Sequence, residues 1–201
     1  IDTIYFIDSV DGKTFLYQDN LMGLFEKMYD GEKMGGQYSL LGKELDAILS
    51  GQDGLEEEDK GLFGYYHVLA ELLSIKARVG GRIREAYRNG NRERLKELAE
   101  NDLKKIAALA QELNRRREEI WMKEYKPFGY EVLDIRLAGV GQRALSAAHR
   151  VQLFLSGSIP RIPELEEEIL PYKTKEMLEG DFQHGFYLWE RIVTAGNIDG
   201  V

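Results

Sequence analysis

Apolar residues recur every three or four positions through most of the chain, and this spacing predicts helices. The clearest run covers residues 62–88, and Asn89-Gly90 supplies its stop. Asn91 then caps a second run that continues to Pro127, a residue that ends helices. At 1.5 Å per residue this second helix would be roughly 50 Å long. We therefore predict two long helices that form an antiparallel hairpin across Asn89-Gly90.

A third long helix is predicted over residues 130–155, with its end at Ser156-Gly157. Shorter helices are expected over residues 20–28, capped by Asp19 and Asn20, and over residues 35–49. The remaining segments are assigned more coarsely: extended pieces in residues 1–17, an acidic loop in residues 52–59, and an amphipathic stretch in residues 182–193.

Together these elements predict an all-α fold, a helical bundle with a long antiparallel hairpin, a third long helix and short flanking helices. A chain of 201 residues can bury one good core. We divide it into a connecting segment with short helices, residues 1–60, and a helical bundle domain, residues 61–201. The chain starts without Met and within an apolar alternation, as expected of a piece cut from a longer protein.

Composition narrows the classes of function. Charged residues make up 31% of the chain, which argues against a membrane-spanning protein. The net charge of −8, with acidic and basic residues interleaved, argues against a nucleic-acid partner. The chain has no cysteine, so it has no disulfide and no thiolate metal site, and we expect it in the cytoplasm.

Metal and cofactor sites find little support in the motifs. A ferritin-like di-iron bundle uses Glu-x-x-His pairs, and the residues three before His67, His149 and His184 are Gly, Ser and Asp. The run from Gly139 to Ala144 matches a relaxed dinucleotide fingerprint, but it lies inside a predicted helix and is better explained by close helix packing. We predict no metal, no cofactor and no catalytic residue in this chain.

The break between the second and third long helices carries the candidate binding residues. The break falls at Lys126-Pro127-Phe128-Gly129, and aromatic and charged residues flank it. A helix break exposes backbone donors, and the start of a helix favours anions. We therefore predict a substrate-binding or pocket-edge role for four residues: Trp121, Glu131, Asp134 and Arg136. The alternative is a structural elbow in which Asp134 and Arg136 pair with each other.

Two stretches resemble a known family. Residues 16–25, LYQDNLMGLF, are similar to the segment that follows the catalytic barrel in bacterial three-domain β-N-acetylhexosaminidases of glycoside hydrolase family 20. Residues 121–136, WMKEYKPFGYEVLDIR, followed by Arg143 and Arg150, resemble the signature of the helical C-terminal domain of these enzymes. The likeness extends through residues 72–90 and 160–172, and so covers nearly the whole chain.

The resemblance implies a parent enzyme with an N-terminal α/β domain and a (β/α)8 barrel. It implies release of terminal N-acetylhexosamine by substrate-assisted retaining hydrolysis. The family's catalytic motif is an Asp-Glu pair, and this sequence contains no Asp-Glu dipeptide, so we expect the chain to be inactive alone. Its expected partners are the parent barrel, which it would buttress, and a second copy in a homodimer. The alternative is a free-standing helical protein-interaction module, which barrel-coding sequence directly upstream would exclude.

Overall fold

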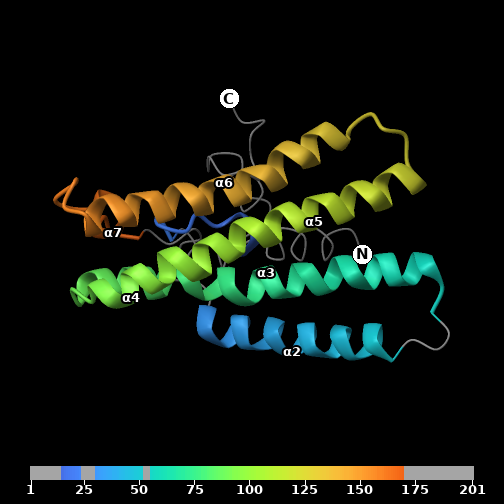
Figure 1. The fold of residues 1–201 in the computed structure, drawn as a ribbon, viewed down its shortest axis with the longest axis horizontal. Helices are drawn as coiled ribbons and strands as arrows, with labels where there is room; N and C mark the ends of the chain where they lie inside the picture. Colours follow the sequence, from blue (N-terminus) through green and yellow to red (C-terminus); the bar gives the residue numbers. More distant parts are fainter. Residues whose placement is uncertain (1–14, 24–29, 52–54, 170–201) are drawn as a thin grey trace, which may run out of the picture.

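The computed structural model describes residues 15–23, 30–51 and 55–169 (Figure 1). Within these ranges the regular elements are helices, and no strand is found. The predicted all-α bundle is confirmed. In chain order the elements are α2 (Gly31–Ser50), α3 (Glu57–Arg88), α4 (Arg92–Glu97), the π-helical turn η1 (Leu98–Asp102), α5 (Leu103–Glu124), α6 (Tyr130–Leu155) and α7 (Pro163–Glu166).

The long helices pack as neighbours in chain order. Helix α2 lies along α3, and α6 lies along α5, with the two pairs inclined to each other where α3 meets α5 (Figure 1). The predicted hairpin is confirmed, since α3 and the run from α4 to α5 meet at Asn89-Gly90. Gly90 has a positive φ of 63°, a conformation that favours glycine. The side chain of Asn91 accepts a 3.0 Å hydrogen bond from the Arg94 backbone N–H and caps α4.

Two apolar clusters join the helices: a large one shared by α3, α5 and α6, and a small one in which Met34 and Tyr38 of α2 pack against Phe15, Leu73 and Ala77. The apolar stripe of the second predicted helix faces the large cluster, where Leu103 and Ile106 have no exposed surface and Leu109 is partly buried. Small residues of α6 reach the same core, as the sequence predicted. At Gly141 an added Cβ would lie 3.4 Å from both the Ala107 carbonyl oxygen and the Ala110 Cβ. The glycine-containing run from Gly139 to Ala144 is therefore a helix-packing surface within α6.

The second long helix is interrupted by η1, which the sequence analysis missed. There the backbone N–H of Leu103 bonds to the carbonyl of Leu98, five residues earlier. Leu98 and Leu103 are both fully buried. Residues five apart do not lie on one face of a regular α-helix, and the extra residue in the π turn brings Leu98 and Leu103 closer to a common face.

Several predicted boundaries before residue 62 are wrong. Helix α3 begins at Glu57, so residues 57–59 are helical where a loop was expected. Their three carboxylates stand in the first turn, where the helix dipole favours negative charge. Helix α2 begins at Gly31, four residues before the predicted start, and residues 15–17 are helical where extended chain was expected. The predicted pieces in residues 1–14 and 182–193 lie outside the described residues.

Candidate functional site

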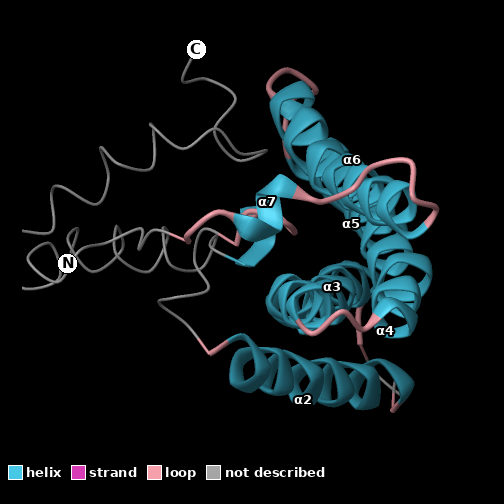
Figure 2. Cartoon of the chain, turned by 90° about the vertical axis from the view of Figure 1, so that its left-hand side faces the viewer, coloured by secondary structure: helices cyan, strands magenta, loops and turns pink. Residues whose placement is uncertain are grey.

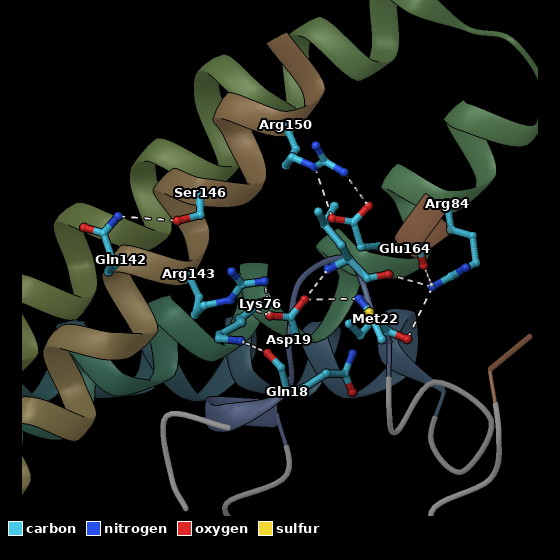
Figure 3. A network of polar contacts seen from close by, with 11 residues as sticks. Gln18, Asp19, Met22, Lys76, Arg84, Gln142, Arg143, Ser146, Arg150 and Glu164 are labelled. Carbon is cyan, nitrogen blue, oxygen red and sulfur yellow. Dashed lines mark hydrogen bonds and ion pairs between the residues drawn. The ribbon is translucent and has the colours of Figure 1, made fainter. Parts of the chain in front are cut away.

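The densest polar network surrounds residues 18–22, which we call the anchor segment (Figure 3). It lies against α3, α6 and α7, and three cationic side chains from α3 and α6 converge on it. Asp19 makes a tight turn at its centre, with Oδ1 accepting hydrogen bonds from the backbone N–H groups of Leu21, at 2.9 Å, and Met22, at 3.1 Å. The sequence predicted that Asp19 would cap a helix at this point. Residues 20–22 instead form a turn.

Lys76 of α3 is the most deeply buried of these cations, with 3% of its surface exposed. Its ammonium donates to the backbone carbonyl oxygen of Gln18 (Figure 3). Burial lowers the pKa of Lys76 to about 8, because a charged amine is poorly solvated inside the protein. The negative charge of Asp19 opposes this lowering, and the positive charge of Arg143 adds to it.

Arg84, two turns further along α3, ties two distant segments together. It is 4% exposed. Its guanidinium donates to the Leu21 carbonyl oxygen at 2.6 Å and to the Leu165 carbonyl oxygen of α7 at 2.8 Å. The planar fork of donors on an arginine suits this double contact. One side chain therefore holds the anchor segment and α7 against the same helix.

Asp19 is fixed from the opposite side by α6. Nε and Nη2 of Arg143 each lie 2.8 Å from Asp19 Oδ2. Burial alone would raise the pKa of Asp19, but the hydrogen bonds from Arg143 and from two backbone N–H groups outweigh it, and the pKa is lowered. Asp19 is therefore a carboxylate held charged by its partners.

A second ion pair closes the network. Arg150, two turns after Arg143 on α6, contacts Glu164 of α7 through Nε at 3.1 Å and Nη2 at 3.2 Å (Figure 3). A cleft of about 470 Å³ opens beside this pair, between α6, the anchor segment and α7. Its wall combines Leu21 and Glu164 with Gln142, Arg143, Leu145, Ser146, His149 and Arg150.

The anchor cations were not among the predicted site residues, although the sequence holds a signal for two of them. Lys76 follows the buried Leu72 by four positions, and Arg84 follows the buried Leu73 by eleven, so each cation shares the helix face of a core leucine. A cation on an apolar face must find buried acceptors. Arg143 and Arg150 entered the sequence analysis only through the family resemblance.

The four predicted edge residues lie at the tip where α5 passes into α6. Trp121 of α5 stacks near Tyr125, with ring centroids 4.9 Å apart, and its indole N–H donates to the Lys126 carbonyl oxygen at 2.8 Å. The guanidinium of Arg117 lies 5.5 Å from the centre of the Trp121 ring. Gly129, with φ of 97°, starts α6 and allows the chain to turn back.

The charged residues of the tip point in different directions. Glu131 accepts a 2.8 Å hydrogen bond from the Gly129 backbone N–H, so it caps its own helix. Asp134 accepts a 2.5 Å hydrogen bond from the Asn114 side-chain amide of α5. Burial raises the pKa of Tyr17, and the positive charge of Arg136 partly opposes this rise, so Arg136 lies near Tyr17. Asp134 is bonded across the helix pair, in place of the Asp134–Arg136 pairing considered for a structural elbow.

Beneath the tip, Tyr130 is buried and connects the two helices. Its hydroxyl lies 2.7 Å from Asn114 Oδ1 and 2.8 Å from the Asn114 carbonyl oxygen. Burial raises the pKa of Tyr130 to about 12, with the negative charges of Glu118 and Asp134 adding to the effect. The hydroxyl therefore stays protonated as a donor near neutral pH.

The tip exposes apolar side chains around this polar base. Phe128 is 88% exposed, the largest exposed fraction among the large apolar residues described. Four neighbours in sequence are also exposed: Met122, Tyr125, Val132 and Ile135. Exposed apolar patches mark surfaces that pack against partners.

Neither region contains, among its described residues, a candidate metal site. In the ranges that the structure describes, no three His, Asp or Glu side chains gather as metal ligands would. His149 stands exposed on the cleft beside α6, and His67 is partly buried on α3. The near match Asp181-x-x-His184 lies outside the described residues. What the anchor network can do chemically is hold a backbone segment in place.

Comparison with known proteins gives one match. The family model described as the Glycoside Hydrolase 20C C-terminal domain matches residues 6–184. The match includes the anchor segment, the tip and every described helix. No curated protein matches the chain. Among the described helices, none is long and apolar enough to cross a membrane.

Proposed function

The chain belongs to the glycoside hydrolase 20C C-terminal domain family, and we propose on this basis that it is the non-catalytic helical domain of a β-N-acetylhexosaminidase. In the parent enzyme, the acetamido oxygen of the sugar would attack the anomeric carbon, and terminal N-acetylhexosamine would be released with retention. The acid that assists this step belongs to the barrel, because this sequence lacks the Asp-Glu pair of the family.

The role that we assign to the chain is to buttress the barrel. The observation that carries this proposal is the anchor network, in which Lys76, Arg84 and Arg143 hold residues 18–22 against the bundle. By the family resemblance, this segment follows the barrel. Buried hydrogen bonds at this point would fix the orientation of the barrel relative to the helical bundle.

The tip supplies a second contact surface. We assign to Trp121, Glu131, Asp134 and Arg136 the role of a pocket edge, placed towards the barrel or towards a second copy of the enzyme in a homodimer. The support is chemical: exposed apolar side chains lie on both sides of Phe128 in sequence, and Trp121 and Glu131 make the hydrogen bonds that shape the turn between the helices. The absence of cysteine from the sequence fits an enzyme that works in the reducing cytoplasm.

Deletion and separate expression test the proposal. A chromogenic N-acetylglucosaminide should be turned over by the parent enzyme and left unchanged by residues 1–201 alone. The parent enzyme without these residues should lose activity through a lower melting temperature of its barrel. Turnover by the isolated, purified chain would contradict the assignment. A barrel with unchanged melting temperature after the deletion would refute the buttressing role and favour an independent interaction module.

A further inference from the structure

The anchor segment is buried, yet its polar groups are incompletely satisfied. Within the part of the chain that the structure describes, the side-chain amide of Asn20 has no hydrogen-bond partner at either Nδ2 or Oδ1. Oε1 of Gln18 also lacks one. Both residues are at least 97% buried, with exposed fractions of 2% and 3%. A buried polar group without a partner costs free energy that exposure to water would return.

The positive charge of Lys76, which holds this segment, has no carboxylate among the described residues as its hydrogen-bond acceptor. The acceptor for Lys76 is the neutral carbonyl of Gln18. The nearby carboxylate of Asp19 is already engaged by Arg143 of α6, and Arg84 of α3 brings a further positive charge to the same segment. Glu164 of α7 is engaged by Arg150. A buried charge in such surroundings favours any state in which water reaches it.

We propose that the anchor segment is a latch that opens while the helices stay folded, and that the positive charge of Lys76 drives this opening. Opening hydrates the Lys76 ammonium together with the amides of Gln18 and Asn20. The helical core, where Leu103 has no exposed surface, stays closed in this open state. The inference concerns this chain alone and does not need the proposed function of the parent enzyme.

The same arrangement determines how opening of the latch depends on pH. In the closed latch the pKa of Lys76 is about 8, and in the open latch it returns towards its ordinary value of about 10.4. The open state therefore binds more protons between these pH values, and raising the pH through this window disfavours opening. When neutral, the Lys76 amine can still donate to the Gln18 carbonyl, so the closed contact is kept.

Thiol labelling can measure the opening, because the chain has no cysteine of its own. Leu21→Cys places a thiol in the latch, and Leu103→Cys places one in the helical core; both positions are at most 1% exposed. Labelling rates are divided by the rate of an unfolded thiol at each pH. We expect Leu21→Cys to label faster than Leu103→Cys. From about pH 7 to about pH 9.5, labelling of Leu21→Cys should slow on the order of ten-fold.

Two further variants assign the effect to Lys76. Adding Lys76→Met should remove the pH dependence of labelling at position 21, whereas adding Lys96→Met, at an exposed position of α4, should keep it. Equal labelling of the two thiols would show that the segment opens only with the whole domain and would overturn the proposal. A pH dependence that survives Lys76→Met would overturn the role of its charge.

Discussion

Arg84 donates a 2.6 Å hydrogen bond to the carbonyl oxygen of Leu21, although the two residues lie 63 positions apart in the chain. The same guanidinium reaches the carbonyl of Leu165, 81 positions later. A buried charge is here balanced by backbone dipoles from two segments, the anchor segment and α7. Loss of this single side chain therefore leaves more than one buried acceptor without a donor.

Replacing Arg84 with Met should lower the free energy of unfolding by roughly 2–5 kcal/mol, since each buried carbonyl left unpaired costs about 1–3 kcal/mol. Urea denaturation followed by circular dichroism measures the change. The matched control is Arg88→Met, one turn further along the same helix, where the side chain is exposed. Similar losses in the two variants would mean that the Arg84 tethers contribute little.

The Asp19 carboxylate should make stability depend on pH at the acid end. Its pKa is lowered in the folded chain, so the unfolded chain takes up the proton first as the pH falls. The stabilisation is therefore complete above the ordinary pKa of about 3.9 and is lost as the pH falls through the folded value. In denaturation curves measured at several pH values, Asp19→Asn should reduce the loss of stability at acidic pH, which we call the acid limb.

The control for Asp19 is an exposed carboxylate. Glu93→Gln, in the first turn of α4, should leave the acid limb close to that of the original chain. If Asp19→Asn and the original chain lose stability in parallel between about pH 5 and about pH 2, the Arg143 pair does not stabilise the fold.

The sequence predicted those parts of the structure that depend on local signals. The bounds of α6 follow from Gly129 and Ser156-Gly157, and the hairpin follows from Asn89-Gly90 and the apolar stripes on both sides. The π turn was missed because no residue of Leu98–Asp102 marks a break in the helical pattern. The anchor was missed because its acceptors are backbone carbonyls, which carry no side-chain signature.

Two glycines should respond in opposite directions to alanine. At Gly31 an added Cβ would lie 2.1 Å from the Ala77 carbonyl oxygen of α3, so the backbones of α2 and α3 must move apart. At Gly81, exposed in the middle of α3, an added Cβ meets no atom within 4 Å. Gly31→Ala should lower the free energy of unfolding by about 1–3 kcal/mol, because the added methyl group overpacks the contact. Gly81→Ala should raise the free energy of unfolding by up to about 1 kcal/mol, because alanine has the higher helix propensity.

Urea denaturation of both variants tests the contact between α2 and α3. A stable Gly31→Ala would show that α2 can shift along α3 at little cost. A loss at Gly81 would show that this face of α3 is covered in the folded chain.

At the tip, substitutions that remove a charge but keep the hydrogen bond distinguish the effect of the charge from the effect of the local structure. Glu131→Gln retains an oxygen that can accept from the Gly129 N–H, and Asp134→Asn retains one for the Asn114 amide. Both variants should therefore keep the melting temperature of the parent enzyme. If the tip forms an edge of the sugar pocket, they should lower kcat/KM for a chromogenic N-acetylglucosaminide several-fold. Glu124→Gln, exposed at the end of α5, is the matched control.

Alanine at position 131 should lower stability, unlike the amide substitutions. Comparing the two kinds of variant distinguishes a structural role of the tip from a role in the sugar pocket. Glu131→Ala removes the cap on α6 and should cost about 1 kcal/mol of stability, whatever the tip does in catalysis. If the tip is a structural elbow, Glu131→Ala should lower the melting temperature, and activity should fall only as a consequence of that loss. A pocket edge predicts reduced kcat/KM in Glu131→Gln and in Arg136→Ala at an unchanged melting temperature. Unchanged kinetics in stable, correctly assembled Glu131→Gln, Asp134→Asn and Arg136→Ala enzymes would leave the tip with a purely architectural role.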